Sequence, residues 1–136
     1  RPEQILVVDN APADDATRSL VAQMPGIQYV LEPRPGLSVA RNTGIRHSTG
    51  DIIAFTDDDV VIHPDWLRRL QQGFQNPKVM SVTGLVLPGE LETEAQVAFE
   101  KGFGGFSQGY RALTFDTQFF NEMKHQGVPV WRIGAG

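Results

Sequence analysis

The chain has 136 residues, a net charge of −4 and no cysteine. This length suits one domain with its own hydrophobic core, and the lack of cysteine excludes disulfides and thiolate metal sites. The mildly acidic charge, without a basic block, argues against nucleic acid as a partner. No apolar run reaches the length of a membrane span and no signal peptide precedes the first predicted strand, so we expect a cytoplasmic domain.

The chain opens with a strand pattern followed by a helical one. Residues 5–8 form a continuous apolar run, which predicts a strand buried on both faces, and polar Asp9 and Asn10 follow it directly. Residues 11–24 predict a helix, because a proline and acids stand at its start and apolar residues recur at helical spacing.

A second strand and a second helix come next. Residues 27–31 predict a short strand, and a turn rich in proline and glycine separates it from a helix over residues 37–45. Ala40 and Gly44 make the buried side of this helix small, which allows a close approach to another backbone or to a ligand.

A third apolar run carries the most distinctive signal. Residues 52–55 predict a buried strand, and three carboxylates follow it, Asp57, Asp58 and Asp59. Open α/β sheets bind ligands at the carboxyl ends of their strands. Side chains two apart on an extended segment share a face, so we expect Asp57 and Asp59 to point into one cleft and Asp58 elsewhere. Carboxylates suit Mg²⁺ or Mn²⁺, especially beside phosphate, although such acids also form solvated turns or helix caps.

The second half continues the alternation and then loses it. Residues 66–74 predict a helix, 79–87 a strand and 92–101 a helix. The order of elements predicts an α/β fold with a mostly parallel, doubly wound sheet, in a single domain over residues 1–136. From residue 102 to 136 the periodicity fails, and the run of glycines and aromatics there is typical of a mobile loop over a site.

Five segments, taken together, resemble the family-2 inverting glycosyltransferases of the GT-A fold. They are ILVVDN at 5–10, PGLSVARNTGI at 35–45, STGDIIAFTDDDV at 48–60, PDWL at 64–67 and WRIGAG at 131–136. Each is weak alone, but all five stand in the order and spacing of that family. The resemblance implies the Rossmann-like fold of nucleotide-diphospho-sugar transferases, in which a nucleoside-diphosphate sugar lies across the carboxyl ends of the strands.

The resemblance also implies a donor site. Asp59, with Asp57, would hold a divalent metal, Mn²⁺ or Mg²⁺, that bridges the donor diphosphate, and Asp57 and Asp58 would lie near the ribose. Asp9 and Asn10 match the position where the family has two acids that contact the base and the ribose. Because Asn10 departs from the acid, the preferred nucleobase is left open.

Arg41 matches a basic position that reaches the nucleotide in this family, where its guanidinium would suit a base edge or a phosphate. The structural alternatives are that Asp9 caps a turn and that Arg41 pairs with an acid on a helix surface. No catalytic residue is assigned. The family places its base beyond the GAG segment, whereas Asp116 and Glu122 precede that segment.

The leading hypothesis is the donor-binding portion of a metal-assisted glycosyltransferase that transfers a sugar from a nucleoside-diphosphate sugar to an acceptor hydroxyl with inversion. The family's first strand and its base region have no counterpart here, so we expect a partial domain with weak or no transfer activity by itself. An alternative is a catalytically inactive nucleotide- or sugar-binding module of the same fold. A nucleotidyltransferase would need a glycine-rich phosphate loop after the first strand, and none is visible.

The sequence leaves the acceptor open as a glycan, a lipid or a polysaccharide. We expect residues 102–136 to lie on the acceptor side, because acceptor choice normally resides in loops. Association with the cytoplasmic face of the membrane, through segments outside this chain, is a further expectation.

Overall fold

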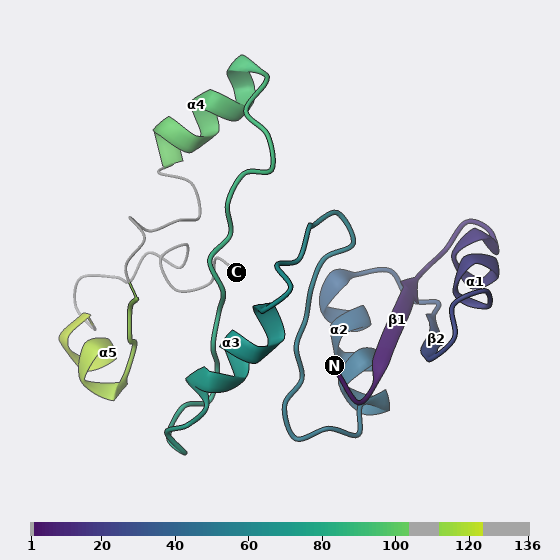
Figure 1. Ribbon diagram of the computed structural model, residues 1–136, viewed down its shortest axis with the longest axis horizontal. Helices are drawn as coiled ribbons and strands as arrows, with labels where there is room; N and C mark the ends of the chain where they lie inside the picture. Colours follow the sequence, from purple (N-terminus) through teal and green to yellow (C-terminus); the bar gives the residue numbers. More distant parts are fainter. Residues whose placement is uncertain (1, 104–111, 124–136) are drawn as a thin grey trace. The chain divides into compact units, whose positions relative to one another are not determined.

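The computed structural model describes residues 2–103 and 112–123 (Figure 1). The chain divides into two compact units, Arg1–Val60 and Val61–Gly136, each with its own elements. In the described part of the chain, no helix is long and apolar enough to cross a membrane.

The first unit is built on a parallel strand pair. Strands β1 (Ile5–Asn10) and β2 (Ile27–Glu32) pair in parallel over their full length, and helix α1 (Ala16–Val21) connects them. Both strands were predicted, and the connecting helix is shorter than the pattern over residues 11–24 suggested. A parallel pair joined through a helix is the basic unit of a doubly wound sheet.

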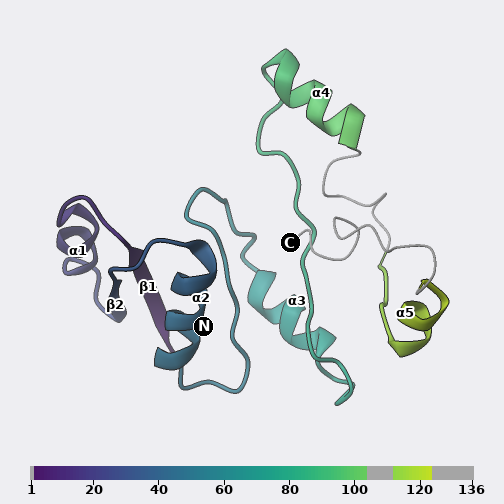
Figure 2. The ribbon, with the colours of Figure 1, turned by 180° about the vertical axis from the view of Figure 1, so that it is seen from behind.

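Helices cover opposite faces of this strand pair. On one face, Val8 of β1 meets Gly44 of helix α2 (Leu37–His47), where an added Cβ would lie 3.5 Å from the Val8 Cγ2 atom. On the other face, the Arg18 guanidinium of α1 lies 5.2 Å from the centre of the Tyr29 ring. Tyr29 of β2 pairs with Val7 of β1 and therefore shares its face of the sheet. Because side chains alternate along a strand, Val8 points to the opposite face from Val7 and Tyr29. Figure 2 shows the strands between α1 and α2.

The predicted strand at residues 52–55 was wrong, as was the one at 79–87. Both segments are irregular, and among the described residues the sheet contains only β1 and β2. A strand forms only beside a partner strand, and residues 52–57 form no hydrogen bond between backbone groups within the described chain. Their apolar side chains therefore stay partly open: Ile53 is 38% exposed and Phe55 47%.

The second unit contains three helices in its described part: α3 (Trp66–Gly73), α4 (Glu94–Phe103) and α5 (Thr117–Met123). Helices α3 and α4 confirm the helical patterns over residues 66–74 and 92–101. The predicted mobile loop falls mostly on residues 104–111 and 124–136, which lie outside the described residues.

In place of a strand, residues 79–87 pack along α3. A Cβ added to Gly73 would lie 2.7 Å from the Val82 Cγ2 atom, and one added to Gly84 would lie 3.4 Å from the Trp66 Nε1 atom. Val82 therefore lies against a helix without the hydrogen-bonded ladder of a sheet, whereas Met80 and Leu85 of the same segment stay 89% and 57% exposed.

Candidate donor site

A groove of about 280 Å³ lies within the first unit. Its walls are residues of β1 such as Val8, the face of α2 that carries Ala40, Arg41 and Gly44, and the irregular segment 52–57. The small side chains expected on α2 are thus at this groove, where Gly44 is buried against β1. Concave, mostly apolar sites with a few polar groups are the usual form of ligand sites.

Arg41 and Asp57 supply charged groups to the groove. The Arg41 Nη2 atom lies 3.8 Å from the Asp57 Oδ1 atom, and the two side chains are 47% and 66% exposed. An exposed pair of this kind contributes little to stability. Because both groups remain open to solvent, their hydrogen-bonding capacity is available to a ligand.

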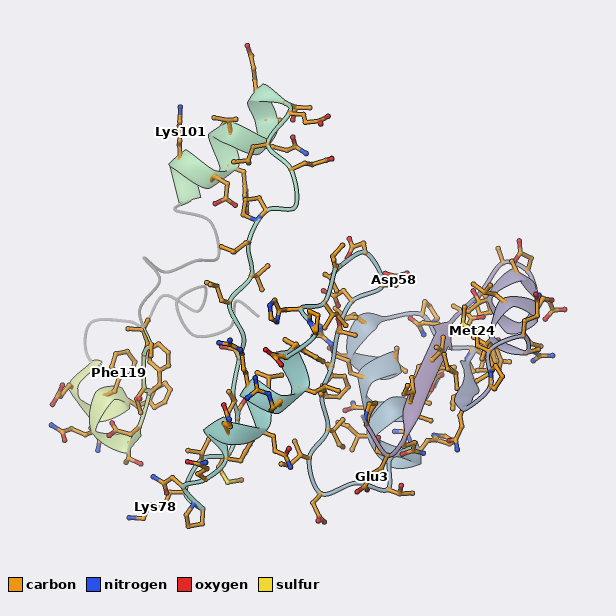
Figure 3. The ribbon with its side chains drawn as sticks, in the orientation of Figure 1. Glu3, Met24, Asp58, Lys78, Lys101 and Phe119 are labelled. Carbon is orange, nitrogen blue, oxygen red and sulfur yellow. The ribbon has the colours of Figure 1, made fainter. Side chains whose placement is uncertain are left out.

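The other two acids of the run take a different geometry. Asp58 and Asp59 form a turn, so the alternation of an extended backbone, on which the shared face of Asp57 and Asp59 was predicted, does not apply here. All three acids are exposed, and the Asp58 side chain projects from its loop (Figure 3). Neither Asp58 nor Asp59 lines the groove.

The acids do not form a ready cage for a metal. Within residues 2–103 and 112–123, no three His or acidic side chains are grouped so that they could hold a metal ion. Mg²⁺ normally takes one or two carboxylates together with substrate phosphates, and not an all-protein cage. Asp57 and Asp59 offer carboxylate oxygens, which are the donor type that this cation takes.

Asp9 lies away from this groove, on the sheet face toward α1. Its Oδ2 atom accepts a hydrogen bond from the Tyr29 hydroxyl at 2.8 Å. Burial and this hydrogen bond to the Asp9 carboxylate raise the pKa of Tyr29. Asp9 is therefore a half-buried carboxylate with a fixed neighbour, at the carboxyl end of β1.

Asn10 uses its side-chain amide to hold the loop between β2 and α2. Its Nδ2 atom donates to the Arg34 carbonyl at 2.7 Å and to the Glu32 carbonyl at 3.3 Å, and its Oδ1 atom accepts from the Gly36 backbone N–H at 2.8 Å. Gly36 is the N-cap of α2 and has a φ of 133°, which favours glycine. Asn10 does not line the groove, and this structural role was missed from the sequence.

Glu32 is a second residue that sequence reasoning missed. It is 4% exposed at the end of β2, and its carboxylate accepts hydrogen bonds from Arg34 and from the Thr43 hydroxyl. These hydrogen bonds hold the pKa of Glu32 well below its usual range. The sequence does contain a signal, an acid at the end of a buried strand with an arginine two residues later.

Comparison with known proteins identifies the class. The family described as Glycosyl transferase family 2 matches residues 1–123. The chain therefore belongs to glycosyl transferase family 2. It has the fold of that family, the GT-A nucleotide-diphospho-sugar transferase fold, of which the first unit provides the parallel α/β part.

Three curated relatives illustrate the similarity. Succinoglycan biosynthesis protein ExoM of Rhizobium meliloti is 39% identical over 61% of this chain and 28% of its own length. Succinoglycan biosynthesis protein ExoO of the same organism is 29% identical over 96% of this chain and 44% of its own length. Glucosyl-dolichyl phosphate glucuronosyltransferase of Haloferax volcanii is 39% identical over 39% of this chain and 17% of its own length. The chain thus spans less than half of each relative, and no solved structure gives a significant match.

Proposed function

We propose that this chain is the donor-binding portion of a metal-assisted inverting glycosyltransferase, which transfers a sugar from a nucleoside-diphosphate sugar to an acceptor hydroxyl. Membership of the family supports the transferase class. The observation that carries the donor site is the solvent-open Arg41–Asp57 pair at the groove of the first unit.

The proposed roles follow from the chemistry of each side chain. Arg41 carries planar, permanently charged donors that suit a phosphate or a base edge. Asp57 and Asp59 would hold Mn²⁺ or Mg²⁺, with Asp58 and Asp57 near the ribose. When bound, the cation would neutralise charge on the departing nucleoside diphosphate.

The nucleoside is proposed to lie near the carboxyl end of β1, beside Asp9 and Asn10. Asp9 offers a carboxylate for a base or ribose donor, while Tyr29 holds it in place. The Asn10 amide is already bonded to the loop before α2, which supports a contribution through the shape of that loop. No residue of this chain is proposed as the catalytic base.

For the acceptor we propose only a chemical class, and for the transferase only a cellular location. The name of one relative refers to the biosynthesis of succinoglycan, a polysaccharide. The name of another refers to glucosyl-dolichyl phosphate, a lipid-linked sugar. We propose an acceptor hydroxyl on a glycan of one of these two types. We also propose that the transferase works in the cytoplasm, at the inner face of the membrane.

The test is a calorimetric titration of the chain with UDP, with and without Mn²⁺. We expect binding that needs Mn²⁺ and is lost in Asp59→Ala, because the carboxylate and the diphosphate share the cation. Asp51→Ala is the matched control, since Asp51 is an exposed acid of the same segment that does not line the groove. It should bind as the wild type does.

Two outcomes contradict the proposal. Binding that is independent of Mn²⁺ and unaffected by Asp59→Ala would indicate a nucleotide-binding module in which the acids form only a polar turn. No binding by the wild type, in a chain shown to be folded by circular dichroism, would remove the donor site from this part of the protein.

A further inference from the structure

The most buried polar side chains of the first unit form one connected cluster at the end of β2. Glu32 is 4% exposed and Thr43 of α2 is 3% exposed. The Glu32 carboxylate accepts from the Arg34 backbone N–H and Nε atom, each at 2.9 Å, and from the Arg34 Nη2 atom at 3.0 Å. It also accepts from the Thr43 hydroxyl, and the Arg46 Nη2 atom lies 3.7 Å away.

A buried carboxylate is unfavourable unless every lone pair has a donor. Among the described residues of this unit, Val21, at 6% exposure, is the one large apolar side chain that is buried about as fully as Glu32 and Thr43. The hydrogen bond from Thr43 to Glu32 therefore helps to fix the position of α2 at the end of β2. Such a network has one satisfied arrangement, which makes it a directional restraint, unlike apolar packing.

Helix α2 is held at two points along its length. At its start, the Gly36 N–H donates to the Asn10 Oδ1 atom at 2.8 Å. Seven residues later, the Thr43 hydroxyl donates to Glu32. Two such restraints fix both the position of the helix and its rotation about its own axis, and Arg41 lies between them.

The helical period relates Thr43 to Arg41. At 3.6 residues per turn, two residues correspond to a rotation of about 200°, so Thr43 and Arg41 project from nearly opposite sides of α2. A rotation that follows the loss of the Thr43 hydrogen bond must therefore also swing Arg41, whose guanidinium lies 3.8 Å from Asp57.

From this arrangement we infer that Glu32 is a positioning residue, which acts through Thr43 to hold the Arg41 guanidinium beside Asp57. The inference rests on the proposed function for its meaning, because Arg41 and Asp57 are proposed to bind the donor. The placement of Arg41 can nevertheless be measured without a ligand.

The first measurement is the Arg41 Nε–H resonance of the ¹⁵N-labelled chain by NMR. Asp57→Asn defines the chemical shift of Arg41 without its ionic partner. We expect Thr43→Val and Glu32→Gln to move the resonance toward that value, and Thr43→Ser, which keeps the hydroxyl, to leave it near the wild-type value. The inference would be overturned if Thr43→Val left the resonance unchanged.

Val21→Ala is the control for a merely structural effect. It truncates a buried side chain of α1, whereas Glu32 ends β2 and Thr43 belongs to α2. It should lower stability and leave the Arg41 resonance in place. A shift in Val21→Ala as large as that in Thr43→Val would show that general loosening moves Arg41, which contradicts a specific restraint.

The second measurement is UDP affinity in the presence of Mn²⁺. Thr43→Val should weaken binding about tenfold, and should cost nothing further in an Arg41→Gln background, because coupled residues are not additive. Equal losses in both backgrounds would overturn the inference. If the wild type binds no UDP, the proposed function fails, while the NMR result still decides whether Glu32 positions Arg41.

Discussion

At the scale of single residues, the charged side chains nearest to the proposed donor site differ in their surroundings. Arg41 and Asp57 pair weakly in the open, whereas Glu32 is buried and surrounded by donors. No buried side-chain nitrogen or oxygen in the described chain lacks a hydrogen-bond partner. The buried polar groups are thus structurally satisfied, and Arg41 and Asp57, which are proposed to bind the donor, stay open to solvent.

The buried carboxylate predicts an acid-sensitive fold. The pKa of Glu32 is lowered from its usual value of 4.5 by hydrogen bonds from Arg34 and Thr43. Its contribution to the free energy of unfolding is therefore complete above pH 4.5 and is lost as the pH falls toward the folded-state pKa. Urea unfolding of the wild type should show stability falling below this pH.

Glu32→Gln separates this carboxylate from the others. The variant should be less stable than the wild type at neutral pH, because it loses the charge that Arg34 and Arg46 face. It should also lose less stability between neutral pH and pH 3 than the wild type does, since its amide does not titrate. An equal loss in the two proteins would show that Glu32 is not the group responsible.

At the scale of elements, the local patterns predicted the helices and the first two strands. Helices α2 and α3 and strands β1 and β2 follow from apolar spacing and from their turn residues, which act within a few positions. The strand predicted at residues 52–55 was wrong, because pairing depends on a distant edge that an apolar run does not encode. The run of acids is present as predicted, but the turn at Asp58 and Asp59 changes its geometry.

Substitution of alanine for Gly73 in α3 and for Gly44 in α2 tests how closely each helix packs against its neighbouring segment. Gly73→Ala would place its Cβ 2.7 Å and 3.0 Å from the two Val82 methyl carbons, which forces a shift. Gly44→Ala would meet Val8 at 3.5 Å, an ordinary contact. We expect Gly73→Ala to destabilise the chain by about 1–3 kcal/mol, as overpacking does. Gly44→Ala should be neutral, or more stable by about 0.5–1 kcal/mol, because alanine favours a helix.

Urea denaturation, followed by circular dichroism, measures both variants against the wild type. Each substitution adds one methyl group inside a helix, so Gly44→Ala serves as the control for Gly73→Ala. Equal stability of the two variants would contradict the close approach of residues 79–87 to α3.

At the scale of the whole molecule, the sequence predicted the class of fold better than the assembly of the site. Arg41 lies beside Asp57, which is the pairing with an acid that the sequence left open as the structural alternative to a role at the nucleotide. Asp9 and Asn10 form hydrogen bonds that the sequence motifs did not predict. Asp9 accepts from the Tyr29 hydroxyl, and Asn10 accepts from the Gly36 N–H in the loop before α2. Side-chain direction depends on which strands pair and which helices cover them, and this information is not local.

Apolar surface predicts how the chain behaves in solution. Within the described residues, β1 pairs along one edge with β2, and large apolar side chains after residue 51 are open, with Phe55 at 47% and Val61 at 102% exposure. Unpaired strand edges and contiguous apolar surface favour association. We therefore expect the chain to self-associate as its concentration rises, in sedimentation velocity experiments at neutral pH.

A charge placed in this surface should reverse the behaviour. Val61→Lys puts an ammonium group at the fully exposed position, where burial against another copy would require its desolvation. It should shift the chain toward the monomer, whereas Gln75→Lys, which adds the same charge at an exposed polar position, should not. A wild type that stays monomeric at all concentrations, or equal effects of the two substitutions, would show that the apolar segment does not drive association. A specific loss of association in Val61→Lys would instead identify the segment that follows the acids as the surface through which two copies of the chain associate.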